Sequence, residues 1–135
     1  MIVLDASFLV AFFNERDVHH PAAARVMQDI IEGAWGRALL PEYVFLEVAT
    51  VLAIRLDLRT AVESGDILLA SREVDFIACS DIFQDALTVF RRQPRSALSF
   101  ADAAIVAVAR RENAPFVATF DDDFRAIEGL TVVPE

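Results

Sequence analysis

Short apolar runs that alternate with helix-patterned stretches constrain the fold of this chain more than any other feature. The apolar runs lie at residues 1–4, 37–40, 73–79, 116–119 and 131–133. Apolar residues recur with helical spacing over about residues 7–13, 22–32, 41–56, 60–71, 80–91 and 99–112. Short apolar strands alternating with helices are typical of a parallel sheet covered on both faces. The pattern therefore predicts an α/β domain whose central parallel sheet has about four to five strands flanked by helices.

Several helix ends carry local signals in the sequence. Pro21 stands in a first helical turn, where proline is tolerated, and Gly33 ends the same helix. Pro41 opens the next helix, which is apolar nearly all round and is therefore expected to be buried. Ser80 and Ser99 stand where N-cap residues are expected for the two following long helices.

The length and hydropathy of the chain predict one domain with a large apolar surface. At 135 residues it forms a single domain, residues 1–135, with one sizeable core. The mean hydropathy of +0.43 is high enough to favour contact with another protein chain. No uninterrupted apolar run reaches the roughly 18 residues of a membrane span, and the first residues carry no basic segment. We therefore expect a cytoplasmic protein without a membrane partner.

The charge of the chain excludes several function classes. The net charge is −9, and all 12 basic residues are Arg. A broad basic surface for nucleic acid is excluded, as are a Schiff-base lysine and a Walker-type phosphate lysine. A metal held by carboxylates can still reverse the local field and admit a nucleic acid. Arg91, Arg92 and Arg95 form the only local excess of positive charge, which suits either substrate contact or a solvated loop.

Cysteine and histidine do not supply a reactive centre. Cys79 is the single cysteine, so an intrachain disulfide and a cysteine-based zinc site are excluded. His19 and His20 lie in a polar connection and are expected to be exposed. No Ser–His–acid set and no glycine-rich phosphate loop can be assembled from the sequence.

Acidic residues follow two of the predicted strands. Asp5 comes directly after the first strand, and Asp121 comes just after the fourth. Ligands of open α/β sheets bind beyond the carboxyl ends of the strands, so both carboxylates are expected at one edge. For Asp5 alone, an N-cap is an equally good interpretation. In the run Asp121–Asp123 the first and third side chains are expected on one side, with Asp122 in a solvated turn.

Glu47 and Asp102 lie within predicted helices. Glu47 has no basic residue three or four positions away, so burial of its carboxylate favours a metal ligand over a distant partner such as Arg55 or Arg92. Asp102 fits a capping box with Ser99, and taken alone it is best explained as a cap. An oxygen-only set of this kind selects hard cations such as Mg²⁺ or Mn²⁺.

Four segments together resemble the PIN-domain ribonucleases, and most of all the VapC-type toxins of prokaryotic toxin–antitoxin pairs. The segments are Val3–Ser7, Glu47 in the helix after Pro41, Leu98–Ile105 and Thr119–Phe124. Each is a weak signal by itself. They extend over nearly the whole chain in the order and spacing of the family, which makes the combination a strong signal.

The resemblance implies roles for individual residues and a PIN-like fold. The acids that match the catalytic and metal-binding positions are Asp5, Glu47, Asp102 and Asp121, with Asp123 as a further acid of the metal site. Ser7 and Thr119 match hydroxyl positions that orient the first and last acids. Ala6 replaces a frequent Thr, and Phe120 replaces a frequently basic residue, which weakens the expected phosphate contact without removing a ligand.

The resemblance also implies an activity and partners. We expect a ribonuclease that uses one or two Mg²⁺ or Mn²⁺ ions to cleave single-stranded or loop RNA, together with a cognate antitoxin, a homodimer and a larger hetero-oligomer with the antitoxin. An antitoxin that inserts an Arg among the carboxylates would compete with the metal. The alternative is a catalytically silent PIN-like scaffold or RNA-binding module. A phosphatase or phosphate-receiver domain is disfavoured because the chain has no Lys.

Overall fold

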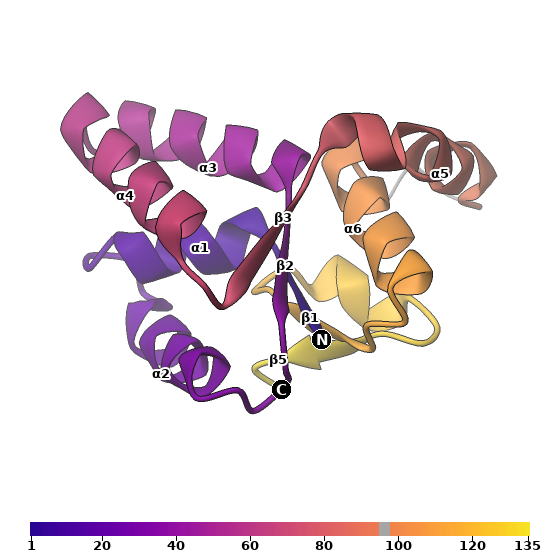
Figure 1. The fold of residues 1–135 in the computed structure, drawn as a ribbon, viewed down its shortest axis with the longest axis horizontal. Coiled ribbons are helices and arrows are strands. Elements are labelled where there is room, and N and C mark those ends of the chain that lie inside the picture. Colours follow the sequence, from indigo (N-terminus) through magenta and orange to yellow (C-terminus); the bar gives the residue numbers. More distant parts are fainter. Residues whose placement is uncertain (95–97) are drawn as a thin grey trace.

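The computed structural model describes residues 1–94 and 98–135, which contain one parallel five-stranded sheet (Figure 1). The strand order is β3-β2-β1-β4-β5, and every neighbouring pair is parallel. The strands are β1 (Ile2–Leu4), β2 (Ala38–Pro41), β3 (Val74–Ile77), β4 (Phe116–Ala118) and β5 (Thr131–Val133). The predicted α/β fold with a central parallel sheet is confirmed.

Helices cover both faces of the sheet. Helices α1 to α4 lie on one side of the sheet, and α5 and α6 lie on the other (Figure 1). The helices are α1 (Ala6–Phe13), α2 (His20–Ile31), α3 (Glu42–Arg55), α4 (Leu58–Ala70), α5 (Cys79–Arg92) and α6 (Phe100–Arg111), with the short 3-10 helix η1 (Asp122–Ala126) before β5. Because both faces are covered, the strands β1 and β2 are buried at every position, as their apolar sequences require.

The N-cap predicted for α5 is wrong. The helix begins at Cys79, and Ala78 occupies the N-cap position, so Ser80 lies inside the first turn. The side chain of Glu42 at the start of α3 accepts a hydrogen bond from the Cys79 N–H at 2.9 Å. A side chain from another helix therefore satisfies this helix end, which local sequence signals cannot reveal.

Helix α3 is less buried than its apolar sequence predicted. Val44, Val48 and Leu52 are buried in the core, while Leu46 and Ile54 are 53% and 78% exposed. The all-round apolar pattern of α3 thus divides into a face that meets the core and a face that meets solvent. The neighbouring helix α4 also exposes large apolar side chains, among them Leu58 and Val62.

The chain changes direction across the sheet between β1 and β4. From β1 it proceeds through β2 to the edge strand β3, then crosses to β4 and the opposite edge β5. The last residues of the two central strands, Leu4 and Ala118, are paired in register. The residues that follow them, Asp5 and Thr119, therefore lie side by side at the switch point, where α/β sheets form their ligand crevices.

The core combines side chains from the sheet, from helices α1 to α6 and from η1. Phe8 and Phe124 are the largest side chains that are fully buried, and they come from α1 and η1 next to the carboxyl ends of the strands. Within the described parts of the chain, no helix combines the length and the apolar content needed to cross a bilayer.

Candidate metal centre

Asp5 is a buried carboxylate that receives two hydroxyl hydrogen bonds. Its side chain accepts bonds from Ser7 Oγ at 2.8 Å and from Thr119 Oγ1 at 2.6 Å, both at Oδ2. Asp5 also occupies the N-cap position of α1, but its side chain makes no capping bond. The capping alternative therefore does not describe this residue: the hydroxyl groups, not the helix, bind its carboxylate.

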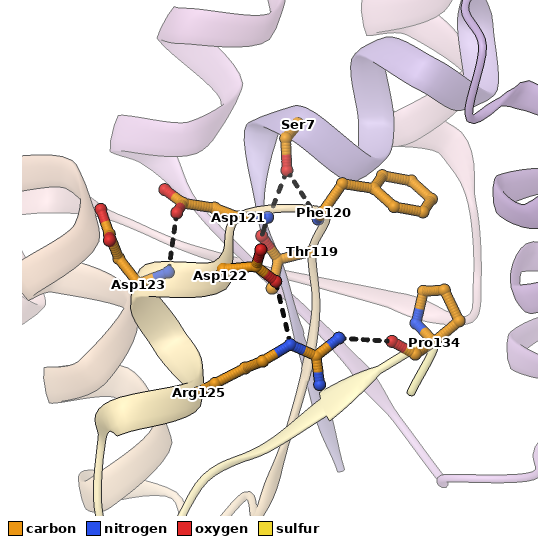
Figure 2. Close-up of polar contacts among 8 residues, drawn as sticks. All are labelled: Ser7, Thr119, Phe120, Asp121, Asp122, Asp123, Arg125 and Pro134. Atoms are coloured by element: carbon orange, nitrogen blue, oxygen red, sulfur yellow. Dashed lines mark hydrogen bonds and ion pairs between the residues drawn. The ribbon is translucent and has the colours of Figure 1, made fainter.

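Ser7 and Thr119 connect the ends of β1 and β4 (Figure 2). The two hydroxyl oxygens lie 3.1 Å apart, and because each has a single proton, their bonds to Asp5 leave none for a bond between them. Both oxygens also accept backbone bonds, Ser7 Oγ from the Phe120 N–H at 3.0 Å and Thr119 Oγ1 from the Asp121 N–H at 2.9 Å. The network fixes Asp5 and the start of the acidic run together.

The three acids of the run have different surroundings (Figure 2). Asp121 is half-buried and caps η1, since its Oδ1 accepts a bond from the Asp123 N–H at 2.9 Å. Asp122 is exposed and pairs with Arg125 at 3.0 Å, which agrees with the solvated turn expected for it. Asp123 is exposed, and its backbone rather than its carboxylate connects it to Asp121. Asp123 is thus more loosely attached to the centre than Asp121.

Asp102 comes from the first turn of α6. The side chain of Ser99 accepts a bond from the Asp102 N–H at 3.1 Å, and Asp102 Oδ2 accepts one from the Ser99 N–H at 3.2 Å. The capping box expected from the sequence is therefore present. Partial burial raises the pKa of Asp102, the Ser99 bonds oppose this, and the negative charges of Asp5 and Asp121 raise it further. The Asp102 carboxyl group therefore both caps α6 and belongs to the acidic cluster.

Glu47 faces the same cluster from α3. Loss of water around its carboxyl group raises the pKa of Glu47, and the charges of Asp5 and Asp102 raise it further. Glu47 is exposed as a whole residue, so the burial expected from its apolar helix is wrong, although its carboxyl group is partly shielded from water. Among the described residues, neither Arg55 nor Arg92 forms an ion pair with Glu47.

These acids form a cluster of like charge without basic partners. The ion pairs in the described ranges, 1–94 and 98–135, involve none of Asp5, Glu47, Asp102, Asp121 or Asp123. The charges of neighbouring acids raise the pKa of Glu47 and of Asp102, and neither residue has an ion-pair partner among the described residues, so the group is suited to an added cation. The donors are all oxygen, which fits Mg²⁺ or Mn²⁺.

The carboxylates are spaced more widely than a closed ligand shell. No three His, Cys, Asp or Glu side chains of the described residues lie close enough to hold an ion between them. This spacing suits Mg²⁺, which keeps several of its waters and is bound through one or two carboxylates. The donor chemistry therefore fits the expected ion, while a compact cage of the kind used for structural zinc is not formed here.

Two of the three arginines proposed for substrate contact fall within the described residues, and neither forms an ion pair there. Arg91 and Arg92 are exposed in the last turn of α5. Arg95 lies outside the described residues. None of the hydrogen bonds found for the described residues joins Arg91 or Arg92 to the acids, and their role in substrate contact stays a prediction.

One neighbour of the cluster has no signal in the sequence. The ring of His19, from the connection between α1 and α2, stacks on Phe120 with centroids 4.3 Å apart and an interplanar angle of 10°. His19 is exposed, as expected, but it lies beside the functional edge of the sheet rather than away from it. Only the fold brings these two rings together, because nothing in the local sequence of either residue indicates the other.

The chain is similar to three solved structures over nearly its whole length. The crystal structure of VapC20 from Mycobacterium tuberculosis, a sarcin–ricin loop cleaving toxin, has a TM-score of 0.82 and 28% identity, with 93% of this chain and 94% of that chain covered. VapBC2 from Rickettsia felis, bound to a DNA fragment from their promoter, has a TM-score of 0.69 at 17% identity, with coverage of 98% and 97%. FitAcB from Neisseria gonorrhoeae has a TM-score of 0.64 at 18% identity, with coverage of 98% and 96%.

The last two likenesses, at low identity, show the fold alone. Comparison with curated proteins gave no significant match. The resemblance to PIN-domain proteins of the VapC type is nevertheless confirmed by the solved structures and by a family model. That model, the PIN domain, matches residues 2–130. The chain therefore belongs to the PIN domain family.

Proposed function

We propose that this chain is a metal-dependent endoribonuclease and the toxin of a toxin–antitoxin pair. The observation that carries the proposal is the group of carboxylates around Asp5, just beyond the carboxyl ends of the paired strands β1 and β4. They come from four separate elements of the chain, lie within electrostatic reach of one another and have no ion-pair partner among the described residues. Helix capping accounts for Asp102 and Asp121 but not for Asp5 or Glu47, and the mutual repulsion of the whole group supports a bound cation.

The residues of this centre would divide the work of phosphodiester hydrolysis. Asp5, Glu47, Asp102 and Asp121 would hold one or two Mg²⁺ or Mn²⁺ ions, with Asp123 at the margin. Such an ion supplies positive charge beside the phosphate and lowers the pKa of a water molecule. Ser7 and Thr119 keep the Asp5 carboxylate in place through the bonds at 2.8 and 2.6 Å. In the reaction the oxygen of water bonds to phosphorus, one P–O ester bond breaks, and the departing oxygen takes up a proton.

RNA is the substrate class that the comparisons favour. VapC20, at 28% identity, is a sarcin–ricin loop cleaving toxin, which supports cleavage of a structured or single-stranded RNA by this chain. The acidic net charge of −9 gives no broad electrostatic attraction to RNA, so the ions themselves would supply much of the local positive field.

The activity can be tested with a mixed pool of single-stranded and hairpin RNAs, including one with the sarcin–ricin loop. We expect cleavage with Mg²⁺ or Mn²⁺, none with EDTA, and a loss of about a hundredfold or more in Asp5→Asn. Asp122→Asn is the matched control, because Asp122 is exposed and paired with Arg125. Cleavage by Asp5→Asn at the wild-type rate would refute the site, and RNA binding without any cleavage would identify the chain as a silent scaffold or RNA-binding module.

A protein partner and self-association are part of the proposal. The resemblance to VapC-type toxins, among them the toxin VapC20 at 28% identity, supports a two-component system with an antitoxin for this chain as well. The exposed apolar side chains on α3 and α4 offer a surface for protein contact; they are Leu46, Ile54, Leu58, Val62, Ile67 and Leu69. Light scattering of the purified chain should give a dimer, and co-expression with a neighbouring small reading frame should give a larger complex. A monomer that captures no such partner would contradict both expectations.

A further inference from the structure

A pocket of about 230 Å³ adjoins the metal centre. It shares two residues with that centre, because Ser7 and Glu47 both line it. Its remaining polar and aromatic wall comes from Asp17, His19, Arg55 and Phe120. Sites for drug-sized ligands are larger, about 300–1,000 Å³, so this pocket suits a single flat group beside the reacting phosphate.

Three aromatic rings run from the core to the wall of this pocket. Phe8 is fully buried, Phe120 is half-buried, and His19 is exposed. Phe120 contacts both of the others, with ring centroids 6.4 Å from Phe8 and 4.3 Å from His19. The outermost ring of this row, His19, is therefore exposed to solvent and packed on Phe120. Stacking on such a ring is the way proteins hold unpaired bases without reading their sequence.

The position of His19 is set before any ligand binds. Asp17 Oδ1 accepts a hydrogen bond from the His19 N–H at 2.8 Å, which fixes the turn. The next residue, His20, is joined through Nδ1 to the carbonyl oxygen of Ala11 at 2.8 Å, which holds the turn against α1. Little conformational freedom of this connection remains to be lost on binding, which favours its use as a recognition element.

Arg55 provides the positive charge of the pocket. It stands in the last turn of α3, two helical turns after Glu47, and takes part in none of the ion pairs of the described residues. Its guanidinium group is a planar fork that matches a phosphate. The pocket thus combines a flat aromatic wall, an available Arg and one carboxylate of the metal centre, Glu47.

We propose that this pocket holds one unpaired nucleobase of the RNA next to the cleaved phosphodiester, stacked on the His19–Phe120 row, with Arg55 on a backbone phosphate. The proposal rests on the ribonuclease function proposed above. It also explains the place of Phe120: the ring between Thr119 and Asp121 supports the base and leaves phosphate contact to Arg55, which comes from another helix.

Binding can be measured without cleavage. RNAs of about 12 nucleotides, each with 2-aminopurine at one successive position, are mixed with the protein in Ca²⁺ in place of Mg²⁺, so that an oxygen-binding cation still offsets the acids, and quenching of the fluorescence by stacking is recorded. We expect quenching at one position with the wild type and with His19→Phe, and about 5- to 100-fold weaker binding with His19→Ala. Arg55→Gln should weaken binding at every position and reduce its salt dependence. Equal quenching by His19→Ala and the wild type would overturn the proposal.

Trp35→Ala is the matched control. Trp35 pairs with Phe116 at the opposite, amino-terminal end of β4, so its removal deletes an aromatic contact far from the pocket. The control should bind and quench as the wild type does. A loss in Trp35→Ala equal to that in His19→Ala would also overturn the proposal, since the effect would then be a general one of lost aromatic packing.

Cleavage gives an independent test. An abasic nucleotide at the quenched position should slow wild-type cleavage by about the same factor as His19→Ala, and the two changes together should cost no more than either alone. Factors that multiply independently would refute the stacking contact. Quenching at one position by a protein that cleaves no RNA would support the base pocket while refuting the ribonuclease function, so the two failures are distinguishable.

Discussion

Thr119 donates a 2.6 Å hydrogen bond to Asp5, and the two residues directly follow the paired central strands β4 and β1. Thr119 is 1% exposed and Asp5 is 5% exposed, so this bond is made away from solvent. A buried carboxylate is stable only with donors of this kind. The bond therefore stabilises the fold and also fixes the position of the Asp5 carboxylate.

Thr119→Val keeps the shape of the side chain and removes its hydroxyl. We expect a loss of about 1.5–3 kcal/mol in the free energy of unfolding, because Asp5 loses one of its two hydroxyl donors inside the protein. Urea denaturation measures the change. Thr131→Val, at the exposed start of β5, is the control and should lie within about 0.5 kcal/mol of the wild type. Equal effects of the two substitutions would show that the buried bond contributes nothing special.

Glu47→Gln should stabilise the metal-free protein at neutral pH. The pKa of Glu47 is raised in the folded state, so the folded protein binds the proton more tightly than the unfolded chain does. Its stability then falls as the pH rises from the ordinary Glu pKa through the raised value, and it is constant above that. Thermal melting in EDTA between about pH 4 and 8 should show a smaller decline in the variant.

The control for this pH dependence is Glu63→Gln. Glu63 is paired with Arg59 on the surface of α4, at 3.0 Å, away from the acid cluster. We expect its melting profile to follow the wild type closely. If Glu47→Gln also follows the wild type over the whole pH range, the like-charge repulsion inferred for the cluster is refuted. Glu47→Gln should also lose RNA cleavage, so this substitution would increase the stability of the metal-free protein and remove its activity.

Added Mg²⁺ or Mn²⁺ should raise the melting temperature. An ion that binds only the folded state stabilises it by about 2.7 kcal/mol at a hundred times its dissociation constant. Asp121→Asn should abolish most of this increase, whereas Asp122→Asn should keep it, because Asp122 is exposed and paired with Arg125. Calorimetry with and without the ion provides the measurement. A full increase in Asp121→Asn would remove that residue from the metal centre.

Ser99→Ala removes the capping box at the start of α6. We expect a loss of about 1 kcal/mol in stability, typical of an N-cap, and a further loss of activity because Asp102 is no longer held by Ser99. Ser80→Ala is the matched control, since Ser80 is exposed inside the first turn of α5 and caps nothing. Chemical denaturation and RNA cleavage should both separate the two variants. Indistinguishable variants would argue against a role of the box in placing Asp102.

The elements of the fold were predictable because their signals are local. The strand Thr131–Val133 is found at the predicted residues, and Ser99 caps its helix as expected. The sequence-based prediction was wrong where a contact between distant residues determines the local structure. At the start of α5, the side chain of Glu42 takes the place of the N-cap predicted at Ser80. The exposure of Glu47 was missed for a related reason: the sequence of α3 does not say which apolar side chains meet the sheet.

The candidate site was predictable only in part. The acids could be proposed from their places after strands and in helices, and the hydroxyl bonds of Ser7 and Thr119 to Asp5 are present in the structure. The wide spacing of the carboxylates and the stack of His19 on Phe120 depend on how distant segments pack. No pattern of residue types encodes these distances.

The joining of β1 to β4 has a consequence for the timing of synthesis. Asp5 leaves the ribosome 114 residues before Thr119, and Asp121 follows Thr119. Because Thr119 and Asp121 follow β4, we expect the nascent chain to lack a working centre until β4 has been made and paired with β1. The RNA cleavage proposed above would therefore be absent while the residues between β1 and β4 are being synthesised, which keeps the unfinished chain from attacking RNA.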